Sequence, residues 1–142
     1  MFNMKKLFNS LIVVVIAALC MGLDSCKKND EPTPEVTPEE LAANIPGTWK
    51  STDDFSPEDN LPSYLQFQKG GKYTEVWIDK AGKGNPLYGK WKIDGSYIAI
   101  SGIAGDEMLI VKSITSSKLV LYFPSFDLHY TKVNDSEIQP YL

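Results

Sequence analysis

Apolar and polar residues alternate with a period of two along most of the chain after residue 47, in short runs separated by turn signals. Eight such runs lie at residues 48–52, 63–68, 73–79, 87–93, 97–100, 107–115, 119–123 and 128–133. No segment between them is long enough for the helical crossover that parallel strands need, so the strands must pair antiparallel. The sequence therefore predicts an all-β fold, and eight strands in simple succession favour a closed up-and-down barrel. A two-sheet sandwich is the alternative.

The segments that flank these runs carry the signals expected for turns and for one short helix. Gly70-Gly71 suits a tight hairpin, because paired glycines accept positive φ, and residues 80–86 form a second predicted turn. Before the first strand, Thr37, Pro38 and Glu40 form a capping box that predicts a helical turn ending at Pro46-Gly47. The tail after residue 133 is too short for a long helix, and none is expected there.

The N-terminal 26 residues read as a targeting segment. Lys5 and Lys6 precede an apolar stretch that runs at most from Leu11 to Leu23, thirteen residues. A helix needs about 20 apolar residues to span a bilayer, so this stretch indicates a secretory signal peptide. Its end, Leu23-Asp24-Ser25-Cys26, resembles a bacterial lipobox, in which the cysteine is acylated and becomes the first residue of the mature chain. Asp24 departs from the usual small uncharged residue.

The domain boundaries follow from this interpretation. Residues 1–25 are the predicted lipoprotein signal peptide, and residues 26–38 are the lipidated Cys26 with a charged, proline-containing linker that should be a disordered tether. Residues 39–142 are the barrel domain. Fatty acyl chains such as palmitate on Cys26 would hold the protein stably, because two or more chains make membrane residence stable. We therefore expect a lipid anchor in the outer membrane, facing either the periplasm or the cell surface.

Composition excludes some partners. The chain has no arginine, and its 14 lysines are outnumbered by 18 acidic residues. Because arginine is the usual reader of phosphates and of guanine edges, nucleic-acid binding is not expected. Cys20 and Cys26 both lie before the predicted domain, which excludes a disulfide framework or a thiolate zinc site within it.

No constellation in the sequence indicates catalysis. His129 is the single histidine, and no motif places a nucleophile and an orienting acid beside it, so a half-exposed strand histidine is the preferred interpretation. Several acids crowd the loop at 53–62, but their spacing matches no calcium loop and favours a solvated loop. No catalytic residue, metal ligand or cofactor is predicted.

Aromatic residues gather in the first half of the predicted barrel. On the strand at 73–79, alternation places Trp77 with Tyr73 and Glu75 on one face, and Val76 with Ile78 on the other. Both faces cannot be core, so Trp77 lies either on an outer patch or in a cavity. Large rings beside polar groups suit an apolar ligand with a polar end. The predicted ligand-binding residues are Phe67, Val76, Trp77, Ile78 and Trp91; scattered core and surface aromatics are the alternative.

Beyond these patterns, the stretch "IPGTWK" at 45–50 resembles the G-x-W opening of lipocalins and of bacterial lipocalin-like domain lipoproteins. The resemblance continues through "YLQFQKGGKY", "YGKWKIDGSYIAI", "IVKSITSSKLVLYF" and "LHYTKV" and covers about residues 45 to 133. It implies a lipocalin-like barrel closed at one end by Gly47 and Trp49, with Lys132 stacked across the indole where the family more often has arginine.

The resemblance also implies a function. A membrane-anchored, monomeric lipocalin-like lipoprotein would bind a small apolar or amphipathic ligand in the barrel. Because fold does not fix function, a structural module of the cell envelope, with a filled barrel that docks a protein partner, is the alternative.

Overall fold

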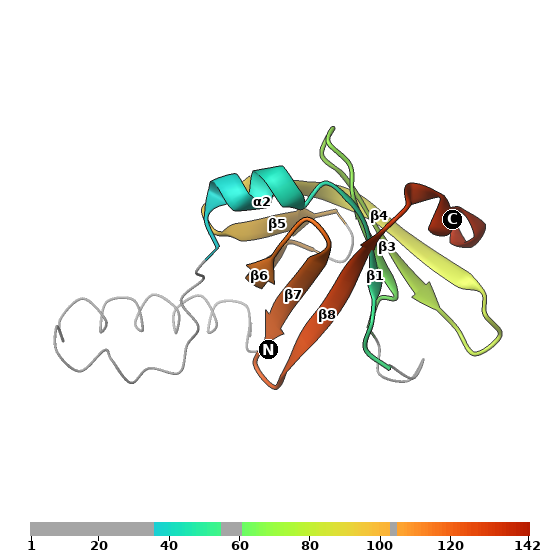
Figure 1. Ribbon diagram of the computed structural model, residues 1–142. Coiled ribbons are helices and arrows are strands. Elements are labelled where there is room, and N and C mark those ends of the chain that lie inside the picture. Colours follow the sequence, from blue (N-terminus) through green and yellow to red (C-terminus); the bar gives the residue numbers. More distant parts are fainter. Residues whose placement is uncertain (1–35, 55–60, 103–104) are drawn as a thin grey trace, which may run out of the picture. The chain divides into compact units, whose positions relative to one another are not determined.

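The computed structural model describes residues 36–54, 61–102 and 105–142. Helix α2 (Pro38–Asn44) is followed by eight strands: β1 (Gly47–Ser51), β2 (Tyr64–Phe67), β3 (Lys72–Ile78), β4 (Gly84–Asp94), β5 (Tyr97–Ser101), β6 (Glu107–Ile114), β7 (Lys118–Phe123) and β8 (Phe126–Val133). Two 3₁₀ turns, η3 (Asp135–Glu137) and η4 (Gln139–Tyr141), end the chain (Figure 1). Cys26 and the predicted signal peptide lie outside the described residues, as does most of the predicted linker.

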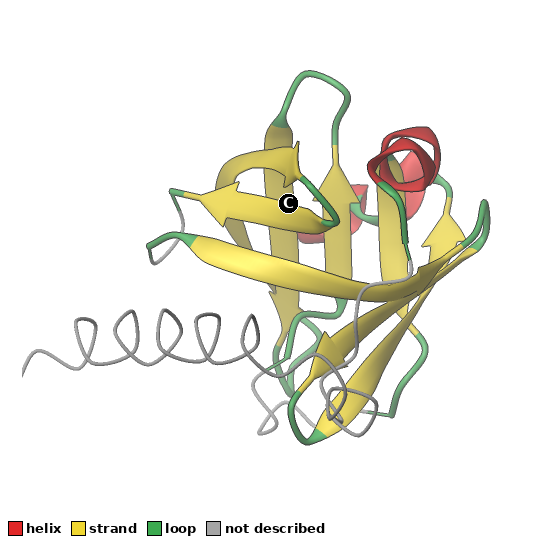
Figure 2. Cartoon of the chain, turned by 90° about the vertical axis from the view of Figure 1, so that its left-hand side faces the viewer, coloured by secondary structure: helices red, strands yellow, loops and turns green. Residues whose placement is uncertain are grey.

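The eight strands form one closed barrel in sequence order, and every neighbouring pair is antiparallel. Closure comes from the pairing of β1 with β8, where Thr48 lies opposite Val133 and Ser51 opposite Tyr130. The strands curl round into a single sheet with no free first or last strand (Figure 2). The predicted up-and-down barrel is confirmed, and the sandwich alternative is wrong.

Inward-facing side chains fill much of the barrel. Trp49, Phe67, Ile98, Val111 and Leu119 are fully buried in one continuous cluster. The predicted capping box forms, since the Thr37 hydroxyl accepts from the Glu40 amide at 3.2 Å and the Glu40 carboxylate accepts from the Thr37 amide at 2.9 Å. Helix α2 inserts Leu41 into the same cluster and so covers one end of the barrel. We call this the closed end and the opposite end the open end.

Strand β4 begins earlier than the sequence predicts. The turn expected at 80–86 is shorter, and Pro86 lies within the strand opposite Val76. A proline fits there because the Val76 carbonyl accepts from Ser63 on the β2 side, which makes Val76 and Pro86 a non-hydrogen-bonded pair. Strand β5 pairs only with residues 90–94, so the first half of β4 extends beyond its neighbour.

The C-terminal tail is more ordered than the sequence suggests. Ile138, between η3 and η4, is fully buried against Tyr64 and Val76 on the outer face of the barrel. A Cβ at Gly84 would collide with the Tyr141 backbone, so glycine at this position permits the close approach of η4 to β4. Short 3₁₀ turns can thus cover an apolar outer patch without a long helix.

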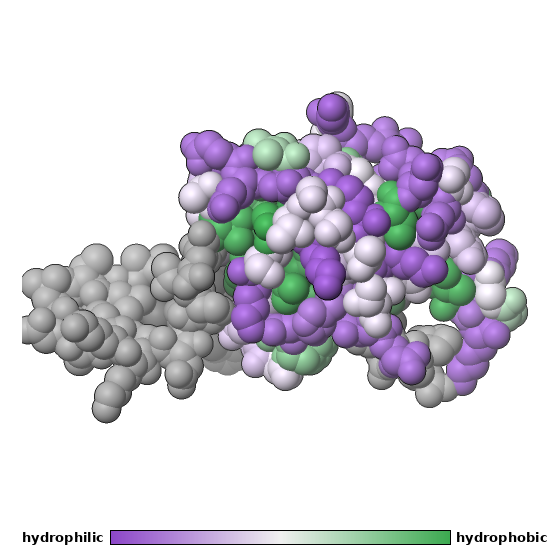
Figure 3. Space-filling view, viewed as in Figure 1, coloured by the Kyte–Doolittle hydropathy of each residue, from purple (hydrophilic) through white to green (hydrophobic). Residues whose placement is uncertain are grey.

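Much of the visible surface is hydrophilic, with apolar areas that are small and separate (Figure 3). Within the described ranges, no helix combines the length and the apolar character that crossing a membrane requires.

Candidate functional site: a cavity at the open end

A small cavity opens inside the barrel at the end opposite α2. Its volume is about 140 Å³. Its lining is apolar apart from two carboxylates, two phenol hydroxyls and one indole N–H, and consists of Leu61, Pro62, Leu65, Tyr73, Glu75, Trp77, Glu107, Leu109, Leu121, Phe123, Leu128 and Tyr130. Such a lining, mostly apolar with a few convergent polar groups, is typical of a small-molecule site, although ligand pockets usually measure about 300–1,000 Å³.

Glu75 is held in a fixed orientation by its two neighbours on the same face of β3. The Tyr73 hydroxyl donates to Oε2 and the Trp77 Nε1–H donates to Oε1, each at 3.0 Å. The alternation of a strand places residues 73, 75 and 77 on one face, and here that face is the inner one. The carboxylate is therefore preorganised, with one donor on each oxygen.

Glu107 enters the same cavity from β6, across the barrel. Burial raises the pKa of the Glu107 carboxyl, and the negative charge of Glu75 raises this pKa further. The anionic form of a carboxyl group is disfavoured both by removal from water and by a negative charge nearby. A bound cation would relieve the second of these costs.

Two tyrosines complete the polar part of the lining. Burial raises the pKa of the Tyr73 hydroxyl well above its ordinary value, and Glu75 adds to the shift of this pKa. Burial likewise raises the pKa of Tyr130, whose hydroxyl donates to the Pro62 carbonyl at 3.3 Å. Both hydroxyls therefore stay neutral donors over the whole physiological pH range.

The sequence-predicted ligand residues occupy three different places. Trp77 lines the cavity. Phe67 is fully buried in the barrel core, where its ring meets those of Tyr73 at 5.1 Å and Trp91 at 5.6 Å between centroids. Trp91 is partly buried, and its Nε1–H donates to the Gln68 carbonyl at 2.8 Å. Phe67 and Trp91 thus fill the interior, and neither lines the open-end cavity.

Val76 and Ile78 lie on the outer face of β3, which corrects the expectation that they line the barrel interior. Val76 is fully buried and Ile78 partly buried in the cluster around Ile138, beneath the C-terminal turns. Both faces of β3 are covered, the inner by the barrel and the outer by the tail. This is why the sequence could not indicate which face is the inner one.

At the closed end, Gly47, Trp49 and Lys132 lie together. The Lys132 ammonium donates to the Asn44 carbonyl at 2.6 Å and to the Pro46 carbonyl at 3.1 Å. Gly47 has φ +135°, and a Cβ there would lie 3.4 Å from Lys132 Cε, so glycine leaves room for the lysine arm. Burial lowers the pKa of Lys132, while Asp135 raises it in part.

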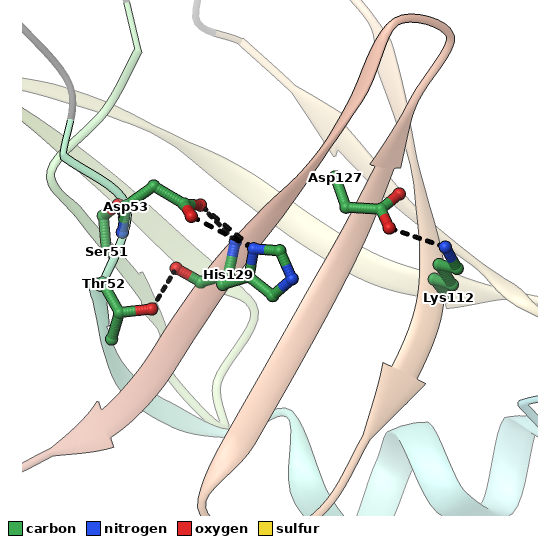
Figure 4. Close-up of polar contacts among 6 residues, drawn as sticks. All are labelled: Ser51, Thr52, Asp53, Lys112, Asp127 and His129. Atoms are coloured by element: carbon green, nitrogen blue, oxygen red, sulfur yellow. Dashed lines mark hydrogen bonds and ion pairs between the residues drawn. The ribbon is translucent and has the colours of Figure 1, made fainter.

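His129 lies outside the cavity, on the outer face of β8 (Figure 4). Its ring Nδ1 is 3.1 Å from Asp53 Oδ1, and its backbone N–H donates to Asp53 Oδ2 at 2.6 Å. Thr52 donates its backbone N–H to the His129 carbonyl at 2.9 Å. The contact between Asp53 and His129 ties the segment after β1 to β8, and among the described residues Asp53 is the one side chain that hydrogen-bonds the imidazole ring. The described ranges hold no group of three or more residues placed to bind a metal ion.

Sequence reasoning missed Glu75, Glu107, Leu61 and Tyr130 as members of one site. The available signal was the alternation of side chains along the strand, which places Glu75 on the same face as Trp77. A charged residue on the inner face of a barrel strand is unusual. Glu107 gave no comparable signal, since it is the first residue of the predicted strand at 107–115 and has no aromatic neighbour on its face.

Comparison with solved structures shows what this fold resembles. The chain is similar to a lipocalin-like protein from Bacteroides uniformis, with a TM-score of 0.51 and 17% identity over 63% of this chain and 98% of that one. A second structure, an uncharacterized protein from Bacteroides eggerthii, aligns with a TM-score of 0.49 and 17% identity over 63% of this chain and all of that one. The first similarity supports a lipocalin-like fold. No protein-family model and no curated protein sequence matches the chain.

Proposed function

We propose that this protein is a lipid-anchored binding module whose lipocalin-like barrel holds the cationic end of a small amphipathic ligand at its open end. The observation that carries the proposal is the Glu75 carboxylate, oriented by Tyr73 and Trp77 inside a mostly apolar cup. Glu107 adds a second acidic group. Glu75 is half-buried and Glu107 is exposed. Two carboxylates that line one cavity favour a cation, because an ammonium group both donates hydrogen bonds and offsets the like-charge repulsion.

The size of the cavity limits the occupant. About 140 Å³ is the space of roughly five water molecules, at about 30 Å³ each in the liquid. An ammonium group with a few methylenes fits this volume, while the rest of a longer ligand would lie outside the barrel mouth. The proposed site thus binds the tip of a molecule and does not enclose a whole lipid.

The proposed location rests on the sequence. The signal peptide and the lipobox ending at Cys26 support an acylated mature chain in the outer membrane, and a barrel on a tether needs no membrane-crossing helix. We propose a monomer that acts by binding, without a catalytic step.

A second function is favoured by the packed interior. Trp49, Phe67 and Leu119 fill the barrel below the cavity, which leaves less volume than most ligand pockets have. On this alternative the protein is an interaction module of the envelope, and the open end receives a lysine side chain of a protein partner.

The experiment is a calorimetric titration of the full chain, in non-ionic detergent, with butylammonium and, separately, with butyrate and butanol. Butylammonium should bind, and the anion and the alcohol should not. Glu75→Gln and Glu107→Gln should each weaken butylammonium binding at least about tenfold, since each removes a charge-assisted contact.

Glu137→Gln is the matched control, because Glu137 is an exposed glutamate in η3 away from the cavity. It should bind butylammonium like the parent chain. Equal binding of all three probes, or binding that survives both cavity substitutions, would overturn the proposal. Native mass spectrometry of the chain purified from its own host separates the two functions, since a co-purifying small molecule supports the first and a co-purifying protein the second.

A further inference from the structure

A groove of about 630 Å³ lies on the outside of the barrel. It shares no lining residue with the open-end cavity, which faces the inner side of β3. Its walls are the turn between β2 and β3, with Gln68 and Lys69, and the C-terminal turns, with Gln139. Its floor is the outer face of β2 and β3, where Gln66 and Thr74 lie opposite each other in register. The groove is therefore built from sheet and tail together, and Phe67 is the one sequence-predicted ligand residue that lines it.

A hydrogen-bonded row of polar side chains runs beneath this groove. The Thr48 hydroxyl donates to Asp135 Oδ1 at 2.7 Å, the Gln66 amide donates to the Thr48 oxygen at 2.9 Å, and the Gln68 amide donates to Gln66 Oε1 at 3.2 Å. A carboxylate only accepts, so the direction of every bond and the orientation of both amides follow from Asp135. The row leaves the side-chain oxygen of Gln68, Oε1, as a fixed acceptor at the edge of the groove.

Thr74 supplies the second polar group. Thr74 is only 2% exposed and lines the groove, and no hydrogen bond among the described residues uses its hydroxyl. Since no buried side-chain polar atom in those residues lacks a partner, this hydroxyl is open to the groove. A hydroxyl open to a groove can bond to water, and a ligand that displaces this water without replacing the bond binds less well. The hydroxyl lies between Gln66 and Tyr88 in the strand register, on the face that forms the groove floor. It can both donate and accept.

An aromatic ring and two lysines border the groove. Tyr88 is 50% exposed, and the Lys72 ammonium lies 5.4 Å from its ring centroid. Lys69 is also exposed at the hairpin turn. An exposed ring beside fixed amide and hydroxyl groups offers both an apolar face and directional hydrogen bonds.

We propose that this groove binds a hydroxylated, uncharged ring, that is, one saccharide unit of a glycan. Adjacent hydroxyls of a sugar act as donor and acceptor at once, which matches the acceptor at Gln68 and the donor–acceptor at Thr74. The C–H face of the ring matches Tyr88. A purely apolar ligand would leave the Thr74 hydroxyl without a partner. For a simple anion, the attraction of Lys69 and Lys72 is opposed by the Asp135 carboxylate and by the oriented side-chain oxygen of Gln68.

The test is an NMR titration of the ¹⁵N-labelled full chain in non-ionic detergent. The probes are the methyl glycosides of glucose, galactose and mannose and free N-acetylglucosamine, each to 100 mM, with sodium phosphate and butanol as comparison probes. At least one sugar should shift the backbone amides of Gln66, Gln68 and Thr74 in a saturable way. Thr74→Val and Gln68→Ala should each weaken this binding at least about fivefold.

The control is Thr131→Val, on the outer face of β8 and away from the groove. It should leave the sugar titration unchanged, as should Glu75→Gln in the open-end cavity, because this site is independent of the proposed function. Thr74→Val is nearly isosteric, and Gln68 is exposed, so one of the two variants will keep the fold. The proposal is overturned if no sugar produces saturable shifts, if phosphate or butanol shifts the same amides as strongly, or if both groove variants bind sugar like the parent.

Discussion

The Lys132 ammonium lies 4.7 Å from the centroid of the Trp49 indole ring, and the two residues are directly opposite each other in the β8–β1 pair. The indole Nε1–H donates to the Ile45 carbonyl at 2.9 Å, so the ring is fixed from its far edge as well. The lysine in turn bonds to the Asn44 and Pro46 carbonyls, at the end of α2. This arrangement joins the first strand, the last strand and the helix at the closed end.

Lys132→Met should destabilise the domain by about 1–3 kcal/mol, because it leaves two partly buried carbonyls without their donor and removes the charge over the indole. Urea denaturation measures the change. Lys118→Met is the control, since Lys118 is an exposed strand lysine at the start of β7, and it should change stability by less than about 0.5 kcal/mol. Equal midpoints for the two variants would show that the Lys132 contacts add nothing.

Glu107→Gln should alter how stability depends on pH. The pKa of Glu107 is raised in the folded chain, so its contribution is fully present below the ordinary value of 4.5 and is lost as pH rises through the folded pKa. The variant should therefore melt at a higher temperature than the parent at pH 7 and at a similar temperature at pH 4. Thermal melts followed by circular dichroism measure this.

The control for the pH experiment is Glu137→Gln, whose carboxylate lies 3.9 Å from Lys50 on the surface. It should show no gain at pH 7. A Glu107→Gln variant that is less stable than the parent at pH 7 would contradict the placement of its carboxyl beside Glu75.

Ile138→Ala should cost about 2–5 kcal/mol, because Ile138 is fully buried between the C-terminal turns and the outer face of β2 and β3. Leu142→Ala is the matched apolar control, since Leu142 is 46% exposed. Chemical denaturation of both variants gives the comparison. A loss for Ile138→Ala no larger than that for Leu142→Ala would mean that the tail is not docked as described.

Asp53→Ala should accelerate hydrogen exchange of the His129 amide by about tenfold, because that N–H donates to the Asp53 carboxylate at 2.6 Å (Figure 4). Asp127→Ala removes a different surface carboxylate, which pairs with Lys112 at 2.6 Å, and should leave the His129 amide protected. Amide exchange followed by NMR distinguishes these outcomes. Unchanged protection in Asp53→Ala would argue that β8 alone holds this amide.

Cys26→Ser should abolish metabolic labelling with an alkyne analogue of palmitate and move the protein from the membrane fraction to the soluble fraction, if Cys26 carries the lipid. Cys20→Ser provides a control within the same segment, and it should keep both the label and the membrane association. Label that persists in Cys26→Ser would exclude the predicted lipobox.

The sequence by itself predicted the strands and their antiparallel order, and it favoured a closed barrel over the sandwich alternative. Period-two alternation, paired glycines and the capping box are local signals, because each depends on residues close together in the chain and fixes the backbone conformation there. The start of β4 was predicted too late, because Pro86 was assigned to the turn at 80–86. A proline is excluded from a strand only where its missing N–H is needed for pairing, and at Pro86 it is not needed.

Only the tertiary structure decided which face of β3 is the inner one and which residues meet in the cavity. Both faces of β3 carry large apolar residues, and one of them is covered by the tail around Ile138, which is 62 positions after Val76 in the sequence. Glu75 and Glu107 belong to strands that are not neighbours, and barrel closure alone brings them into one cavity. Such contacts depend on how the sheet curls, which no short stretch of sequence encodes.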